Sequence, residues 1–134
     1  MRLACIVTGL ALAIIAGCHR APAPGPAAGS SSPHFALVLE RTATGDWAAH
    51  CEVGCAWTDV SMSCGGCQVQ LDASGIGPAG PPARTRKPFA FVVRATSAGW
   101  EAEGISGVRW RRLSWGCRGS PCRARIDEGG VAGV

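Results

Sequence analysis

Several patterns that would assign a function are missing from this sequence. Among its 134 positions it has no tyrosine, only three histidines and only nine acidic residues. A serine nucleophile elbow and a glycine-rich phosphate loop are both missing, and no pair of carboxylates recurs along the chain. We therefore expect a protein that is not an enzyme and that holds neither a metal nor a cofactor.

No segment has the apolar spacing of an amphipathic helix. Apolar residues instead alternate with polar ones, with turn residues at short intervals, which is typical of antiparallel strands. The sequence therefore predicts an all-β fold.

The longest apolar run lies at the amino terminus, where Arg2 precedes residues 3–16. It is too short to span a bilayer comfortably and is typical of a secretory signal peptide. The run ends in Ile15-Ala16-Gly17-Cys18, which resembles the lipobox of bacterial lipoproteins. That resemblance implies removal of residues 1–17, addition of a diacylglycerol to the Cys18 thiol and acylation of its amine, for example with palmitate. Membrane lipid would then be the first partner, because several acyl chains make a lasting anchor.

The residue after the cysteine indicates which membrane would hold the anchor. His19 stands where lipoproteins retained in the inner membrane of enteric bacteria carry an aspartate. We therefore expect a protein of the cell envelope, anchored in the outer membrane. An ordinary signal peptide with an incidental cysteine, or an uncleaved anchor, is the alternative.

A low-complexity segment separates the lipobox from the rest of the chain. Residues 18–33 are mostly alanine, proline, glycine and serine, a composition with too little apolar side chain to build a core. We interpret it as a tether that carries a domain of residues 34–134, which is an ordinary size for one small domain.

That domain contains an internal repeat. Phe35-Ala36-Leu37-Val38-Leu39 corresponds to Phe89-Ala90-Phe91-Val92-Val93, and the match continues through residues 35–78 and 89–134. Repetition at a fixed offset indicates two copies of one supersecondary unit. About eight antiparallel strands follow, four from each copy, packed as a β-sandwich or closed as a small barrel. We expect them near residues 35–41, 47–51, 55–64, 67–72, 89–95, 100–104, 108–117 and 122–127.

The turns and the alternation predict a register within the first copy. Gly65-Gly66 suits a two-residue hairpin turn in which both residues have positive φ. That hairpin would pair Met62 with Val69 on its apolar face. Breaks in the alternation predict bulges at Thr58-Asp59 and Arg111-Arg112.

Other positions recur in both copies and predict the fold. Gly54 and Gly107 each stand third in a short loop, where a left-handed residue is expected. The recurring tryptophans fall at positions where the alternation places apolar side chains, which predicts core packing for Trp47, Trp57, Trp100 and Trp110. The same prediction applies to Trp115, which replaces Met62.

Six cysteines remain in the domain once Cys5 leaves with the signal peptide and Cys18 carries lipid. An exported protein makes disulfides their expected fate. Comparison of the copies favours three local pairs, because two cysteines are present together in one copy and absent together from the other. The expected disulfides are Cys51 with Cys55, Cys64 with Cys67, and Cys117 with Cys122.

The first four of these cysteines have other interpretations. Cys51-x3-Cys55 followed by Cys64-x2-Cys67 resembles the paired knuckles of a zinc ribbon. Cys64-Gly65-Gly66-Cys67 also has the spacing of a redox dithiol, although such motifs normally open a helix. A zinc-binding or thiol-redox module is therefore the alternative to a non-catalytic binding or structural role.

Charge differs between the copies. Residues 35–78 carry five acids and one arginine, whereas residues 89–134 carry seven arginines and four acids. Strand parity places four arginines on one outward face, where they would form a possible site for an anionic envelope component: Arg109, Arg111, Arg123 and Arg125. The alternative is a solvated face that complements the acidic first copy. Nucleic acid is not expected, because no aromatic platform is interleaved with these arginines.

One motif in the first copy has a wider resemblance. Gly54-Cys55-Ala56-Trp57, followed by Val60-Ser61-Met62-Ser63 and Leu71-Asp72, resembles a pattern in short exported bacterial proteins. The second copy matches it loosely at Gly107-Val108-Arg109-Trp110. This resemblance implies no activity.

Overall fold

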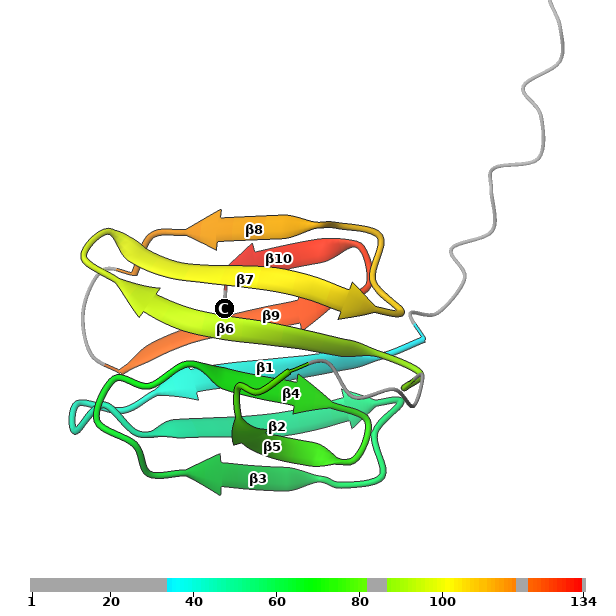
Figure 1. Cartoon of the computed structure of the whole chain (residues 1–134), viewed down its shortest axis with the longest axis horizontal. Helices are drawn as coiled ribbons and strands as arrows, with labels where there is room; N and C mark the ends of the chain where they lie inside the picture. The colour runs from blue at the N-terminus through cyan, green and yellow to red at the C-terminus, as the bar shows by residue number, and fades with distance from the viewer. Residues whose placement is uncertain (1–33, 82–86, 118–120, 134) are drawn as a thin grey trace, which may run out of the picture. The chain divides into compact units, whose positions relative to one another are not determined.

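A computed structural model describes residues 34–81, 87–117 and 121–133. These residues form ten strands and no helix, in two antiparallel five-stranded sheets that do not close into a barrel (Figure 1). The all-β prediction is confirmed, and the architecture is that of a β-sandwich. The expected signal peptide of residues 1–17 and most of the expected tether lie outside the described residues.

Each sheet combines three strands of one repeat with two strands of the other. The first sheet has the order β10, β9, β1, β2, β3, with bounds Gly130–Gly133, Cys122–Asp127, Ala36–Arg41, Trp47–Val53 and Asp59–Met62. The second sheet has the order β5, β4, β6, β7, β8, with bounds Gly75–Pro78, Val69–Asp72, Ala90–Thr96, Gly99–Ser106 and Arg112–Trp115. The two orders are equivalent, so the repeats are related by a pseudo-twofold axis. β1 pairs with β9 and β4 pairs with β6, and these two pairings join the repeats.

The predicted hairpin at Gly65-Gly66 is wrong. Met62 pairs with Trp47 in the first sheet, and Val69 pairs with Val93 in the second. Of the two glycines, Gly66 alone has a positive φ, of 88°. The chain therefore crosses from one sheet to the other at this turn. Alternation fixed which side chains face inward, but it carries no information on which strand lies alongside.

Two strands were missed, and the bulges lie elsewhere. β5 and β10 are short and glycine-rich, and such segments read as turns in a sequence. The register shifts lie at the Ala36/Leu37 and Ala90/Phe91 steps, in the pairs β1 with β2 and β6 with β7. At the predicted bulges the alternation breaks because β3 begins only at Asp59 and β8 only at Arg112.

Aromatic residues from both repeats meet in the core. Phe35 stacks on Phe89 with ring centroids 4.1 Å apart, and Trp47 contacts Trp100 at 5.0 Å. All four side chains are buried, which confirms the core packing predicted for Trp47 and Trp100. The remaining tryptophans are partly buried against this core. Two of them bond equivalent carbonyls: the Trp57 and Trp110 indoles donate to the carbonyl oxygens of Asp72 and Asp127, each over 3.0 Å.

Two glycine turns lie at the end of the sandwich where the described chain begins, which we call the proximal end. Gly54 and Gly107 have φ values of 85° and 66°, so the predicted left-handed conformation is confirmed. A Cβ at Gly54 would overlap the carbonyl oxygen of His34, and one at Gly107 would overlap that of Pro88. We call the opposite end, with the turns at residues 42–46 and 97–98, the distal end.

The exchange of strands makes a testable prediction about folding. Residues 34–81 and 87–134, produced as separate chains, should each fail to form the sandwich and should assemble into a one-to-one complex when mixed. Each fragment alone leaves β1 and β4, or β6 and β9, without the partner strands that complete their sheets. Native mass spectrometry and the near-ultraviolet circular dichroism of the tryptophans measure the assembly.

The disulfides do not complicate this experiment, because each of the three lies within one fragment. A fragment that gives the native tryptophan signal alone, as a monomer, would contradict the prediction.

Candidate functional site

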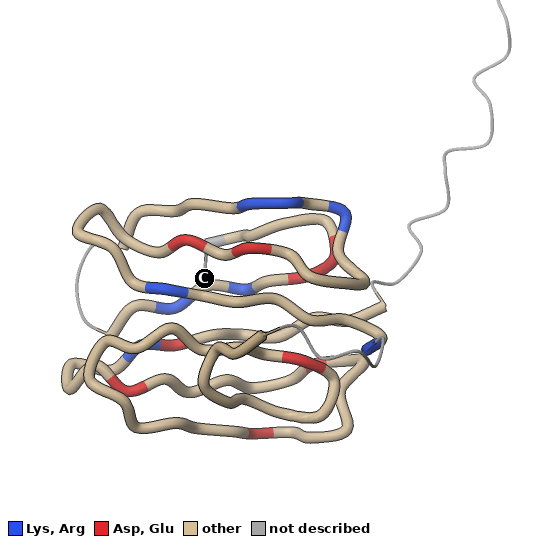
Figure 2. Tube along the Cα trace, viewed as in Figure 1, with Lys and Arg blue, Asp and Glu red and all other residues tan. Residues whose placement is uncertain are grey.

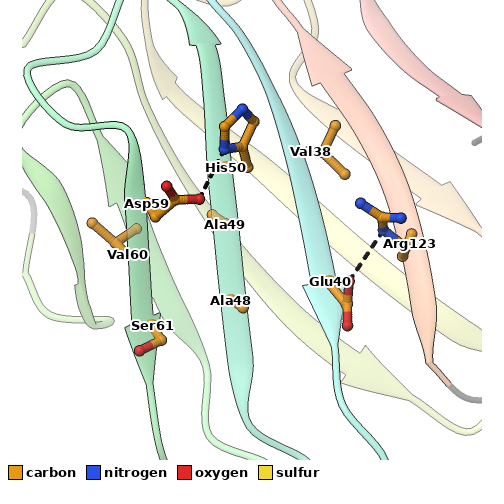
Figure 3. A pocket seen from close by; sticks show the side chains of 9 residues that line it. All are labelled: Val38, Glu40, Ala48, Ala49, His50, Asp59, Val60, Ser61 and Arg123. Atoms are coloured by element: carbon orange, nitrogen blue, oxygen red, sulfur yellow. Dashed lines mark hydrogen bonds and ion pairs between the residues drawn. The ribbon is translucent and has the colours of Figure 1, made fainter.

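The outer face of the first sheet has a hollow of about 460 Å³ (Figure 3). Four strands, β1, β2, β3 and β9, supply its lining. The residues are Val38, Glu40, Ala48, Ala49, His50, Asp59, Val60, Ser61 and Arg123. Arg123 comes from the second repeat and the other eight lining residues come from the first, so the pairing of β9 with β1 completes one side of the hollow.

Strand register explains the shape of this hollow. In one row across the sheet Ser61 lies opposite Ala48, which lies opposite Glu40, which lies opposite Arg123. Because alanine is the shortest of these side chains, the surface is depressed over β2. Val38 in the next row adds to the apolar floor.

Two pairs of polar side chains border the floor. The Arg123 Nε lies 3.1 Å from Glu40 Oε2, and His50 Nδ1 lies 2.8 Å from Asp59 Oδ1. The His50 and Asp59 side chains are 53% and 75% exposed, so both are open to a ligand. Exposed pairs of this kind contribute little to stability.

The equivalent surface of the second sheet is nearly filled, with a hollow of about 50 Å³. Glu101 stands at the position of Ala48 and forms an ion pair with Arg94, which stands at the position of Glu40. The two sheets share their strand order, so this difference comes from side chains and not from topology. The hollow is thus a property of the first sheet.

The residues around the hollow suit hydrogen bonding to a polar ligand. Glu40 and Asp59 offer acceptors, Arg123 offers donors, and the Ser61 hydroxyl can do either. Figure 3 places Ser61 and the His50 imidazole at opposite ends of the hollow, so these two do not form a nucleophile with its base.

The four arginines predicted to share a face are separated. Arg123 and Arg125 lie on β9 in the first sheet, whereas Arg109 and Arg111 precede β8 in the second. Figure 2 shows these basic segments in two places, along β9 and at the start of β8. The premise of adjacent strands is wrong because the chain changes sheets between β8 and β9. Anion binding by these residues stays a prediction.

Arg123 and Arg125 instead complement the acidic first repeat. Arg125 Nε donates to Glu52 over 2.8 Å, and its Nη1 donates to Asp127 over 3.1 Å. The hydrogen bond to Glu52 is the main cause that raises the pKa of Arg125; burial opposes it, and the charges of Glu52 and Asp127 add to the rise. Together with the pair of Arg123 and Glu40, these contacts join β9 to β1 and β2.

The six cysteines form the three pairs that the repeat comparison predicted, with Cα atoms 6.2, 5.6 and 5.8 Å apart. Cys51 and Cys55 lie at the proximal end of the hairpin of β2 and β3. The other two pairs lie where the chain crosses between sheets. Local pairing predicts that each disulfide closes the end of a hairpin, and for these two that prediction is wrong.

The arrangement also bears on the zinc alternative. Cys51 and Cys64 lie beyond opposite ends of the paired segments of β2 and β3, six residues apart along the strands, or about 20 Å. One zinc ion bound by all four cysteines of the first repeat does not fit that separation. Among the described residues, no group of three or more histidine, cysteine, aspartate or glutamate side chains is placed to hold a metal ion.

Sequence reasoning did not identify the hollow. Its residues are common types with no motif, and its shape depends on strand neighbours that alternation cannot reveal. One signal was present: Ala48 and Glu101 are equivalent outward positions that differ greatly in size and charge.

Comparison with known proteins found no matching family model, no matching curated protein and no matching solved structure. No described segment is a helix long and apolar enough to cross a bilayer. Cys18 lies outside the described residues, so its acylation stays a prediction.

Alkylation separates the disulfide and thiol interpretations. Intact mass of the purified protein after alkylation without reductant should show no alkyl group on the six domain cysteines, and reduction before alkylation should add six. Elemental analysis of the same sample should find no stoichiometric zinc. Alkylation of any pair without reductant, or one zinc per chain, would support the alternative instead.

Proposed function

We propose that this protein is a lipid-anchored component of the bacterial cell envelope that binds a polar partner on the outer face of its first sheet, without catalysis. The observation that carries the binding role is the hollow over Ala48, which is nearly filled at the pseudo-symmetric position of the second sheet. The lipobox and the low-complexity segment support the anchor.

The tether suits this role. Residues 18–33 could extend over about 45 Å, at roughly 3 Å per residue for a proline-rich chain. That reach lets a domain attached at its proximal end approach partners beyond the lipid surface. His19 after the acylated cysteine favours the outer membrane.

The disulfides support a location outside the cytoplasm. Three local pairs in a domain of about one hundred residues are what a small exported fold needs to supplement its core. A structural role for all three also accounts for their positions, at one hairpin end and at two crossings between the sheets.

The anchor is tested by replacing Cys18. In cells given labelled palmitate, the wild-type protein should carry label and partition into detergent, whereas Cys18→Ala should lose both properties. Cys5→Ala is the matched control, because Cys5 should leave with the signal peptide and its loss should change nothing. Retention of label by Cys18→Ala would exclude the anchor.

The binding face is tested by crosslinking in the intact envelope. A photo-reactive phenylalanine analogue at Ser61, beside the hollow, should give a discrete adduct on irradiation. The same analogue at Ser114, the equivalent exposed position of the second sheet, should give none. Adding Ala48→Glu, which copies the filled surface of the second sheet, should abolish the adduct at Ser61.

Two results would contradict this site. Equal adducts from Ser61 and Ser114 would indicate contact without preference, and an adduct that survives Ala48→Glu would place the partner outside the hollow. Glu101→Ala should create a hollow on the outer face of the second sheet. This variant controls for the general effects of substituting a surface residue.

A further inference from the structure

The last residue of β1 is a charged residue at a core-facing position. Leu37 and Leu39 point inward and are fully buried, and strand alternation gives Arg41 the same direction. The second repeat has Ala95 at this position, which packs against the core. Arg41 therefore departs from the repeat at a place where an apolar side chain fits.

Arg41 lacks a counterion among the described residues. Its guanidinium lies over the Trp47 ring, with Cζ 5.7 Å from the centroid, and its Nε is buried without a hydrogen-bond partner. By contrast, three other arginines that lie within strands each pair with a carboxylate at the surface: Arg94, Arg123 and Arg125. A partly buried guanidinium is normally paired, because an unpaired one loses hydration without compensation.

Arg41 is one of the residues that line a hollow at the distal end. This hollow measures about 320 Å³ and is lined on the β1 to β2 side by Arg41, Thr42 and Gly45, and on the β6 to β7 side by Thr96 and Ser97. The turn passes close to the cation at Gly45, where a Cβ would lie 3.5 Å from Arg41 Nη2, an ordinary van der Waals contact.

The carboxylate of this turn is engaged elsewhere. Asp46 accepts a hydrogen bond from the Thr44 hydroxyl over 2.8 Å, and within the described chain it forms no ion pair with Arg41. The hollow thus combines one positive charge with hydroxyl groups from both turns. That combination matches an oxyanion, which accepts hydrogen bonds from guanidinium and hydroxyl donors at once.

We propose that the distal hollow binds an oxyanion, a carboxylate or a phosphate group, through the Nη groups of Arg41 and the hydroxyls of Thr96 and Ser97. Since Nε is sealed from solvent, the positive charge is incompletely hydrated, which strengthens its attraction to an anion. The site lies at the end opposite His34 and is separate from the hollow of the first sheet, so it does not depend on the proposed function.

The test uses the full chain in a neutral detergent at constant ionic strength, with inorganic phosphate, acetate and galacturonic acid as probes. Nuclear magnetic resonance should show saturable shifts of the Arg41 Nε–H and Trp47 indole signals, while those of Arg94 and Trp57 stay in place. Phosphate against acetate distinguishes the two anions, and the acidic sugar tests a carboxylate carried on a glycan.

Variants locate the site. Arg41→Gln keeps much of the side-chain stem and should weaken binding of the best probe by about tenfold or more, as expected for loss of a charged hydrogen bond. Arg94→Gln, which removes a surface arginine from the second repeat, should change affinity by less than about twofold. Arg41→Lys keeps the charge and should retain part of the affinity, which guards against a folding defect in Arg41→Gln.

Three results would overturn the proposal: no saturable shift with any probe, equal affinity of Arg41→Gln and the wild type, or equal shifts at the exposed Arg109 and Arg111. The first result would mean that no anion binds specifically, and the other two would mean that anions bind outside the distal hollow.

Discussion

The pairing of strands between the two repeats is the constraint on which the rest of this structure depends. β1 needs β9 and β4 needs β6, because three strands from one repeat and two from the other complete each sheet. Neither repeat completes a sheet alone, and the aromatic pairs Phe35 with Phe89 and Trp47 with Trp100 join the halves at the core. The hydrophobic effect and backbone pairing therefore act between the repeats as well as within them.

This exchange also decides what the surface can do. Glu40 and Arg123 are far apart in the sequence and adjacent in the first sheet. The opposite charges of the repeats meet along β9, where Arg123 and Arg125 contact glutamates of the first repeat. Since exposed ion pairs contribute little free energy, these contacts complement a pairing that the core already enforces.

The duplication separates what the fold needs from what it does not. The glycines at residues 54 and 107 and the core aromatic residues serve the same purpose in both halves. Positions that differ without a structural need mark the two proposed sites: Ala48 against Glu101 on the outer face, and Arg41 against Ala95 at the distal end. The fold tolerates either residue at each pair, so stability alone does not explain the choice.

The sequence by itself determined the all-β class, the inward-facing residues, the left-handed glycines and the cysteine pairs, because alternation, turn chemistry and spacing are local. Only the tertiary structure decided that Met62 and Val69 lie in different sheets, that the four arginines separate, and that a hollow opens over Ala48. Each of these depends on which strands become neighbours. Strands with the same alternation can pair in several ways, and the choice is made by how two whole apolar faces pack together, which no single segment encodes.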